Sequence, residues 1–174
     1  MIHVLEKHIA DKIAAGEVID RPVSIIKELL ENSIDAGADQ ITVEIRNGGK
    51  TYIRVTDNGC GIEAGDMETA FLRHATSKIS SVRDLDAIGT LGFRGEALAS
   101  ICAVARVELI SKTADAKMGR RVVTEGSEIL ANEGIGCPEG TTVTVQDLFY
   151  NVPARQKFLS SDNGESRRII DMVS

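Results

Sequence analysis

The sequence contains no tryptophan, and only 3% of its 174 residues are aromatic. A hydrophobic core must therefore be built mainly from Ile, Val, Leu and Ala side chains. No apolar run approaches the ~20 residues that cross a bilayer, and the first residues lack the long apolar region of a signal peptide. We therefore expect neither a membrane span nor a secretion signal.

Cysteines and basic residues are also few. The three cysteines, Cys60, Cys102 and Cys137, are odd in number and lack the spacing of a metal site, which predicts reduced thiols in a cytosolic protein. Lysine and arginine total 20 against 26 acidic residues, and the net charge of −6 disfavours a domain built mainly to bind nucleic acid through its phosphates. The remaining composition, 43% hydrophobic and 26% charged, fits one globular domain.

Hydrophobic spacing predicts an α/β fold in which helices pack on one face of a mixed sheet. Helices are expected over residues 8–17, 21–36, 64–73, 96–102 and 165–174. Strands are expected over residues 41–45, 52–55, 104–111, 119–124, 127–131 and 141–147. Residues 74–95 are rich in Ser, Thr, Asp and Gly, which predicts a long mobile loop of the kind that often serves as a lid.

A polar stripe follows one face of the helix predicted over residues 21–36. Glu28, Asn32 and Asp35 fall at i, i+4 and i+7, beside an apolar stripe. Two carboxylates and an amide oxygen aligned in this way suit a phosphate that carries a bound metal ion. Glu28 is placed to orient a water, Asn32 to ligate a hard cation and Asp35 to support either.

Asp57 ends a predicted strand and is followed by a turn that contains Gly59 and Gly61. Glycines let the backbone approach a ligand closely, and a carboxylate here accepts a hydrogen bond from the exocyclic amine that adenine has and guanine lacks at that position. A wrong base would leave the carboxylate unpaired, at a cost of about 1–3 kcal/mol. The commoner role of Asp-Asn-Gly is a strand-end cap, and both interpretations stay open at this point.

A second glycine-rich segment, residues 89–95, leads directly into the helix predicted from Glu96. Converging backbone amides and the positive end of a helix dipole make such a segment a phosphate cradle, although a flexible connector uses the same residue types. Thr76, Ser77 and Lys78 are compatible with phosphate contacts, and an exposed loop would also contain such residues.

Several segments closely resemble the N-terminal ATPase domain of the MutL family of DNA mismatch repair proteins. They are ELLENSIDAG at 28–37, DNGCGI at 57–62, RHATSK at 73–78, LGFRGEALASI at 91–101, AAGEVI at 14–19 and DLFYNVPAR at 147–155. The resemblance spans nearly the whole chain in the expected order. MutL belongs to the GHKL superfamily, together with DNA gyrase, heat-shock chaperones and histidine kinases.

The resemblance implies a GHKL ATPase fold, a two-layer sandwich that binds Mg-ATP between its helices and a mixed sheet. Glu28 matches the general base, Asn32 the Mg²⁺ ligand and Asp57 the carboxylate that holds the adenine amine. The other implied nucleotide-binding positions are Gly61 and Thr141 at the base, and Thr76, Ser77, Lys78, Gly92, Phe93, Arg94, Gly95, Glu96, Ala97 and Leu98 in the lid over the phosphates. Asp35 belongs to the same motif without an assigned role.

The resemblance also implies partners and a cellular role. ATP binding is expected to order the lid and to drive homodimerisation, which couples mismatch recognition by MutS to a downstream nuclease or helicase on DNA. The expected compartment is the cytoplasm of a bacterium, or the nucleus of a eukaryote. We expect residues 1–174 to be the N-terminal ATP-binding domain, ending before the second lobe that supplies a lysine to the γ-phosphate, so that hydrolysis by this fragment is weak or absent.

Three alternatives remain. The ATPase lobe of a type II topoisomerase shares the acidic base, the asparagine and the Asp-x-Gly-x-Gly turn, but the segments at 73–78 and 91–101 favour mismatch repair. A histidine kinase lacks a water-activating glutamate at the position of Glu28. A non-catalytic interaction module would use its glycine loops only as connectors, and nucleotide titration distinguishes it.

Overall fold

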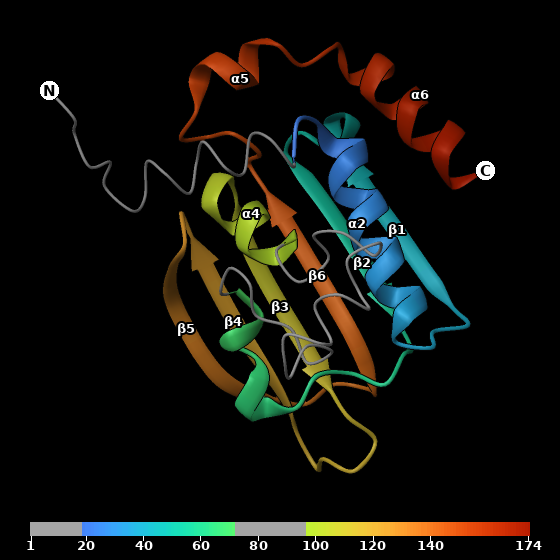
Figure 1. The fold of residues 1–174 in the computed structure, drawn as a ribbon, viewed down its shortest axis with the longest axis vertical. Coiled ribbons are helices and arrows are strands. Elements are labelled where there is room, and N and C mark those ends of the chain that lie inside the picture. Colours follow the sequence, from blue (N-terminus) through green and yellow to red (C-terminus); the bar gives the residue numbers. More distant parts are fainter. Residues whose placement is uncertain (1–18, 72–96) are drawn as a thin grey trace, which may run out of the picture.

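The computed structural model describes residues 19–71 and 97–174, and within these ranges the strands form one six-stranded sheet (Figure 1). The strands are β1 (Ile41–Arg46), β2 (Tyr52–Asp57), β3 (Arg106–Lys112), β4 (Gly119–Glu125), β5 (Glu128–Ile135) and β6 (Gly140–Gln146). Their order across the sheet is β1-β2-β6-β3-β4-β5.

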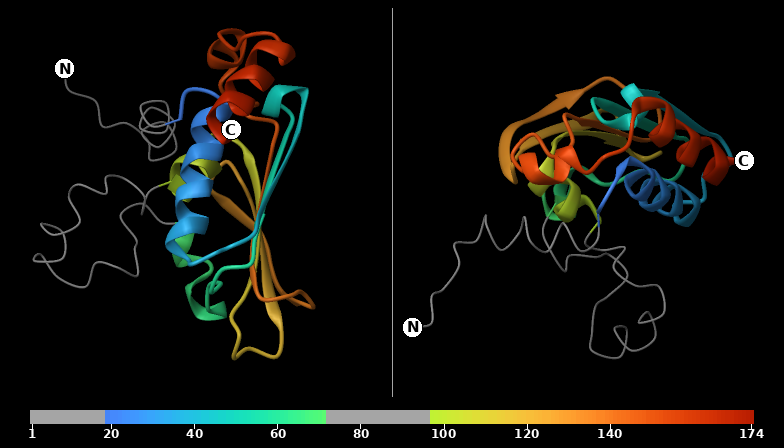
Figure 2. Two further views of the ribbon diagram at one scale, coloured as in Figure 1. Left: turned by 90° about the vertical axis from the view of Figure 1, so that its right-hand side faces the viewer. Right: turned by 90° about the horizontal axis from the view of Figure 1, so that it is seen from above.

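Every strand pair in the described sheet is antiparallel, so the prediction of a mixed sheet is wrong. Short connections join β1 to β2, β3 to β4 and β4 to β5, and a short connection between neighbouring strands forces them to run in opposite directions. The broader prediction, a two-layer α/β fold with helices on one face, is confirmed (Figure 2).

The helices cover one face of the sheet. They are α2 (Pro22–Asp35), α4 (Ala97–Val104), α5 (Pro153–Lys157) and α6 (Asp162–Val173), with single 3₁₀ turns η1 (Asn47–Gly49), η2 (Ala64–Asp66) and η3 (Thr69–Phe71). Helices α2 and α4 lie over the sheet, whereas α6 packs against η1 and α2 at one end of it (Figures 1 and 2). None of the helices in the described ranges is both long enough and apolar enough to cross a membrane.

Most predicted elements are present with shifted ends. The helix predicted over 21–36 is α2, whereas the one predicted over 64–73 is wrong for its described part, where η2 and η3 replace it. Met67 and Phe71 are buried and have helical spacing. Gly65, near the start of the segment, disfavours a continuous helix. Helix α5 was not predicted. The helix predicted over 8–17 and the loop predicted over 74–95 lie outside the described residues.

The core lies between the helices and the inward face of the sheet. Helix α2 buries Ile25, Ile26 and Leu29 on the side that packs on β2, where Ile53 and Val55 are buried. Helix α4 covers β3, whose alternate residues are buried in the same core. Burying such a side chain fully stabilises the fold by about 1.5–3 kcal/mol. The core is therefore largely aliphatic, as the scarcity of aromatic residues predicts. Helix α2 turns its apolar side toward the sheet, which leaves its polar stripe beside the buried face.

Candidate functional site

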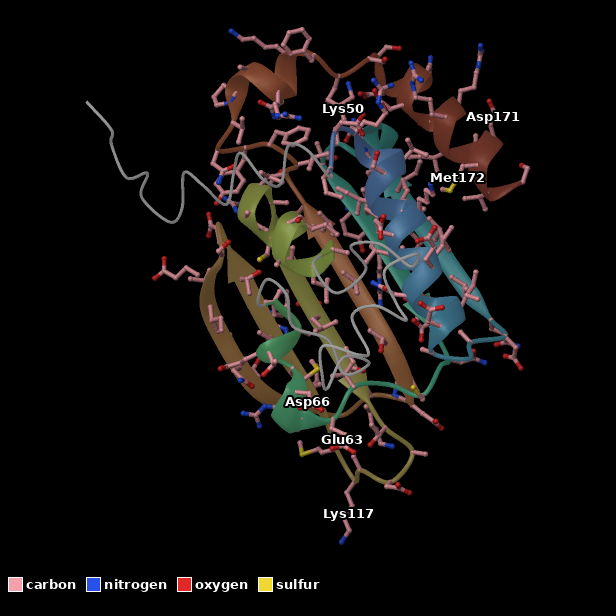
Figure 3. All side chains as sticks on the ribbon, viewed as in Figure 1. Lys50, Glu63, Asp66, Lys117, Asp171 and Met172 are labelled. Atoms are coloured by element: carbon pink, nitrogen blue, oxygen red, sulfur yellow. The ribbon has the colours of Figure 1, made fainter. Side chains whose placement is uncertain are left out.

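The predicted site residues of the sheet meet where β2 ends, β3 ends and β6 begins, at the lower end of the sheet in Figure 1. Asp57 lies opposite Thr141, and Thr141 lies opposite Ser111. Antiparallel pairing thus brings together residues that are far apart in the sequence. Figure 3 labels Glu63 and Lys117, which follow β2 and β3, near this end.

The Asp57 carboxylate accepts three hydrogen bonds from three different segments. Its Oδ1 accepts from the backbone amide of Gly59 at 2.9 Å and from that of Thr141 at 3.3 Å. Its Oδ2 accepts from the Ser33 hydroxyl on α2 at 2.7 Å. The bond from Gly59 is the strand-end cap that the sequence allowed. The other two bonds join the carboxylate to a neighbouring strand and to the helix layer, so capping is only part of its role.

The Ser111 hydroxyl organises the adjacent part of the site. It accepts from the backbone amide of Ile62 at 2.8 Å, donates to the Gly140 carbonyl at 2.9 Å and lies 2.8 Å from Thr141 Oγ1. A hydroxyl has one hydrogen, so when Ser111 donates to Gly140, Thr141 must be the donor in the remaining contact. The Thr141 oxygen then keeps its lone pairs as acceptors.

Two glycines at this end have no room for a side chain. A Cβ built on Gly61 would lie 2.1 Å from the carbonyl oxygen of Lys112, and one built on Gly140 would lie 2.1 Å from that of Asp57. Both glycines have positive φ angles, +76° and +123°. Glycine is therefore required at Gly61 and Gly140 for the ends of β2 and β3 and the start of β6 to lie this close together.

Helix α2 carries the predicted polar stripe beside its buried face. Glu28 and Asn32 are half-buried and Asp35 is exposed, as their i, i+4, i+7 spacing predicts for the edge of the buried face. The last turn of α2 is tied to the Asp57 turn, because the Cys60 amide donates to the Ala36 carbonyl at 3.0 Å. Within residues 19–71 and 97–174, no group of three His, Cys, Asp or Glu side chains is placed to hold a metal.

The structure places some, but not all, of the predicted phosphate-binding residues. Ala97 and Leu98 form the first turn of α4, with Ala97 buried and Leu98 half-buried. The others lie outside the described residues: Thr76, Ser77, Lys78, Gly92, Phe93, Arg94, Gly95 and Glu96.

Ser33 and Ser111 belong to the site although neither was predicted from the sequence. Each is a polar residue in an otherwise apolar inward-facing series, Ser33 one turn after Leu29 on α2 and Ser111 after Val107 and Leu109 on β3. A hydroxyl at such a position needs a buried partner, which is a signal of a polar site, but the pattern does not identify that partner.

Comparison with known proteins extends over most of the chain. Residues 21–134 match the family described as histidine kinase-, DNA gyrase B- and HSP90-like ATPases. The chain is 60% identical over 172 residues to the DNA mismatch repair protein MutL of Agathobacter rectalis, covering 99% of this chain and 26% of that protein. It is 54% identical over 173 residues to MutL of a Thermoanaerobacter species, with coverage of 99% and 28%. The chain thus spans about a quarter of the length of these curated relatives.

Solved structures share the fold. The Aquifex aeolicus MutL ATPase domain complexed with ADP matches with a TM-score of 0.70 and 35% identity, over 90% of this chain and 54% of that one. A crystal structure described as the N-terminal domain of a DNA repair protein matches with a TM-score of 0.78 and 32% identity, over 94% and 47%.

Proposed function

The chain belongs to the family of histidine kinase-, DNA gyrase B- and HSP90-like ATPases, and from that premise we propose that it binds an adenine nucleotide at the end of the sheet where Asp57 lies. The observation that carries this proposal is the hydrogen bonding of the Asp57 carboxylate, in which the described residues leave one acceptor position open. The related MutL ATPase domain of Aquifex aeolicus, complexed with ADP, supports it.

Lone-pair geometry favours adenine. A carboxylate oxygen has two lone-pair positions, and both positions on Oδ1 are taken by the amides of Gly59 and Thr141. Oδ2 accepts one bond from Ser33, and within residues 19–71 and 97–174 its second position stays open. An exocyclic amine fills that position, whereas the carbonyl of guanine or hypoxanthine would place two acceptors against each other. This contact would make Asp57 the residue that selects the base.

The phosphates would lie toward α2 and the start of α4. In this arrangement Glu28 would orient the attacking water as general base, and Asn32, one helical turn later, would hold Mg²⁺ through its side-chain oxygen. A single protein oxygen fits Mg²⁺, because this ion usually keeps several waters and takes further oxygens from the nucleotide. The ion would neutralise phosphate charge. Ala97 and Leu98, with the lid residues named above, would contact the phosphates.

The proposal extends to the whole protein through its relatives. Two proteins with more than half of their aligned residues identical to this chain are both named DNA mismatch repair protein MutL, which favours mismatch repair over a topoisomerase. We assign to the full-length protein a nucleotide-dependent homodimer that couples mismatch recognition by MutS to a downstream nuclease or helicase on DNA. The full-length protein would then act in the cell compartment that contains the DNA.

Calorimetric titration with ADP and Mg²⁺ tests nucleotide binding directly, and absence of binding would refute the proposal. In the full-length protein, Glu28→Gln should keep nucleotide affinity within about twofold and lower the rate of ATP hydrolysis by about 10²–10⁴-fold, the usual contribution of a general base. Glu31→Gln is the matched control, because Glu31 is also a half-buried carboxylate of α2, one helical turn from Glu28, and has no assigned role. Undiminished hydrolysis by Glu28→Gln would remove Glu28 from the role of base.

A further inference from the structure

We infer that Ser33 is a positioning residue that fixes the acceptor with which Asp57 selects adenine. This inference rests on the proposed function, because it concerns how the same site distinguishes bases. Ser33 would not contact the nucleotide itself but would act through the Asp57 side chain.

The Ser33 hydroxyl acts as a donor inside the fold. Its side chain lies on the buried face of α2, and the residue is 3% exposed. Its Oγ lies 2.7 Å from Asp57 Oδ2, and an ionised carboxylate can only accept, so the hydrogen belongs to Ser33. Hydrogen bonds to a charged group in a partly buried setting are among the stronger ones in proteins.

This bond determines which position on Asp57 remains open. The two backbone amides hold Oδ1, but they leave the carboxylate free to pivot about that oxygen. The bond from Ser33 prevents the pivot and occupies one of the two positions on Oδ2. One acceptor in one direction is left for a ligand. Without Ser33, Oδ2 would have two open positions and no fixed direction.

The surrounding backbone keeps Ser33 at this distance. The Ala36 carbonyl, at the end of α2, accepts from the Cys60 amide at 3.0 Å. A Cβ built on Gly59 would lie 2.7 Å from Ala36 Cβ, so the turn after Asp57 and the end of α2 are in direct contact. The helix cannot move away from the turn without losing this contact. The position of the Ser33 hydroxyl is therefore set by the fold rather than by a ligand.

The test compares the affinities for ADP and IDP, which share the ribose and phosphates and differ at the base. In Ser33→Ala, ADP affinity should fall about tenfold while IDP affinity stays within about twofold, so that the ADP:IDP ratio falls about tenfold. Ser100→Ala is the matched control. It removes a fully buried hydroxyl from α4 that has no hydrogen-bond partner among the described residues, and the ratio should not change.

A double-mutant cycle separates positioning from a general loss of structure. In the Asp57→Asn background, Ser33→Ala should cause no further fall in the ADP:IDP ratio. An equal loss of affinity for both nucleotides, or the same fall in ratio with and without Asp57, would overturn the inference while leaving the proposed function intact. If the unaltered protein binds neither nucleotide, the proposed function fails first.

Discussion

At the end of the sheet nearest α6, side chains hold the carboxylate of Asp162, whereas backbone amides and one buried hydroxyl hold that of Asp57 at the opposite end. Asp162 pairs with Lys50 Nζ at 2.9 Å and accepts from Asn47 Nδ2 at 3.1 Å. Figure 3 shows Lys50 at this end, beside α6. Asp57 takes two of its three bonds from the backbone.

The two carboxylates differ in how firmly the fold holds them before any ligand binds. Asp162 is exposed, and its partners are side chains that can rotate away. Its contacts tie η1 to the start of α6, where Ser161 accepts from the Gly164 amide and the buried Glu165 accepts from the Ser160 amide. The partners of Asp57 are fixed by sheet register and by α2. Rigid donors leave one acceptor in a fixed direction, which is what a binding site requires.

The largest expected effect contrasts Gly61→Ala with Gly48→Ala, one glycine from each end. A Cβ on Gly61 would meet the carbonyl of Lys112 in β3 at 2.1 Å, whereas one on Gly48 would meet that of Asp162 in α6 at 2.7 Å. Strand β3 is paired on both sides, with β6 and β4, so a shift of its backbone would disturb two strand pairings. Gly61→Ala should therefore lower the free energy of unfolding by about 3–4 kcal/mol and abolish ADP binding. Gly48→Ala should cost about 2 kcal/mol and preserve binding.

Urea denaturation and calorimetry measure these two outcomes. Gly37→Ala is the control for backbone strain alone, because Gly37 has a similar φ of +77° and nothing within 4 Å of a built Cβ. Its cost should be about 1–2 kcal/mol. If Gly61→Ala and Gly48→Ala lost the same stability and bound ADP with the same affinity, the two ends of the sheet would not differ in the way proposed.

The Asp57 end was partly predictable from the sequence. The strand that ends at Asp57 and the positive-φ glycine at Gly61 follow from local patterns, because alternation and turn residues act over a few positions. The partner of Ser33 does not, since it is set by the packing of α2 on a strand 24 residues away. Thr141 was placed only by resemblance, and the structure explains its position through register with Asp57.

The α6 end was less predictable. Helix α6 begins at Asp162, three residues before its predicted start, because Ser161 caps it. A further miss lies at the Asp57 end, where β5 continues from its predicted end at residue 131 to Ile135 through Asn132, Glu133 and Gly134, since it pairs along the whole of β4. The ends of these elements depend on neighbours in space rather than on local pattern.

The roles of Glu28, Asn32 and Asp35 on α2 stay predictions.

Replacing each of the two carboxylates, Asp57 and Asp162, by an amide should give the next largest effect. In Asp57→Asn, the amide oxygen would take the two backbone donors, and its NH₂ group would then face the adenine amine, which is also a donor. The Ser33 hydroxyl could turn and accept from the NH₂ group, but the adenine amine has no such alternative. ADP affinity should fall about 10–100-fold by calorimetry. Asp162→Asn is the matched control and should leave ADP affinity unchanged. Unaltered affinity in Asp57→Asn would contradict the base contact.

The smallest effect is the acid sensitivity of the α6 end. Hydrogen bonds from Lys50 and then Asn47 lower the pKa of Asp162 below its usual value of 3.8. A lowered folded-state pKa gives stability that is present above the unfolded-state pKa and is lost as pH falls through the folded-state value. Asp162→Asn should therefore melt about 1–2 °C below the unaltered protein at pH 6, and this difference should shrink below about pH 4.

Thermal melts between about pH 2 and pH 6 measure that difference. Lys50→Met removes the charged partner and keeps the aliphatic chain, so its melting temperature should show the same pH dependence relative to the unaltered protein. A difference that stays constant with pH would mean that the charge of Asp162 does not help to tie η1 to α6, because the contacts from both Lys50 and Asn47 favour the ionised carboxylate. The contrast between the two ends would then not depend on the ion pair at the α6 end.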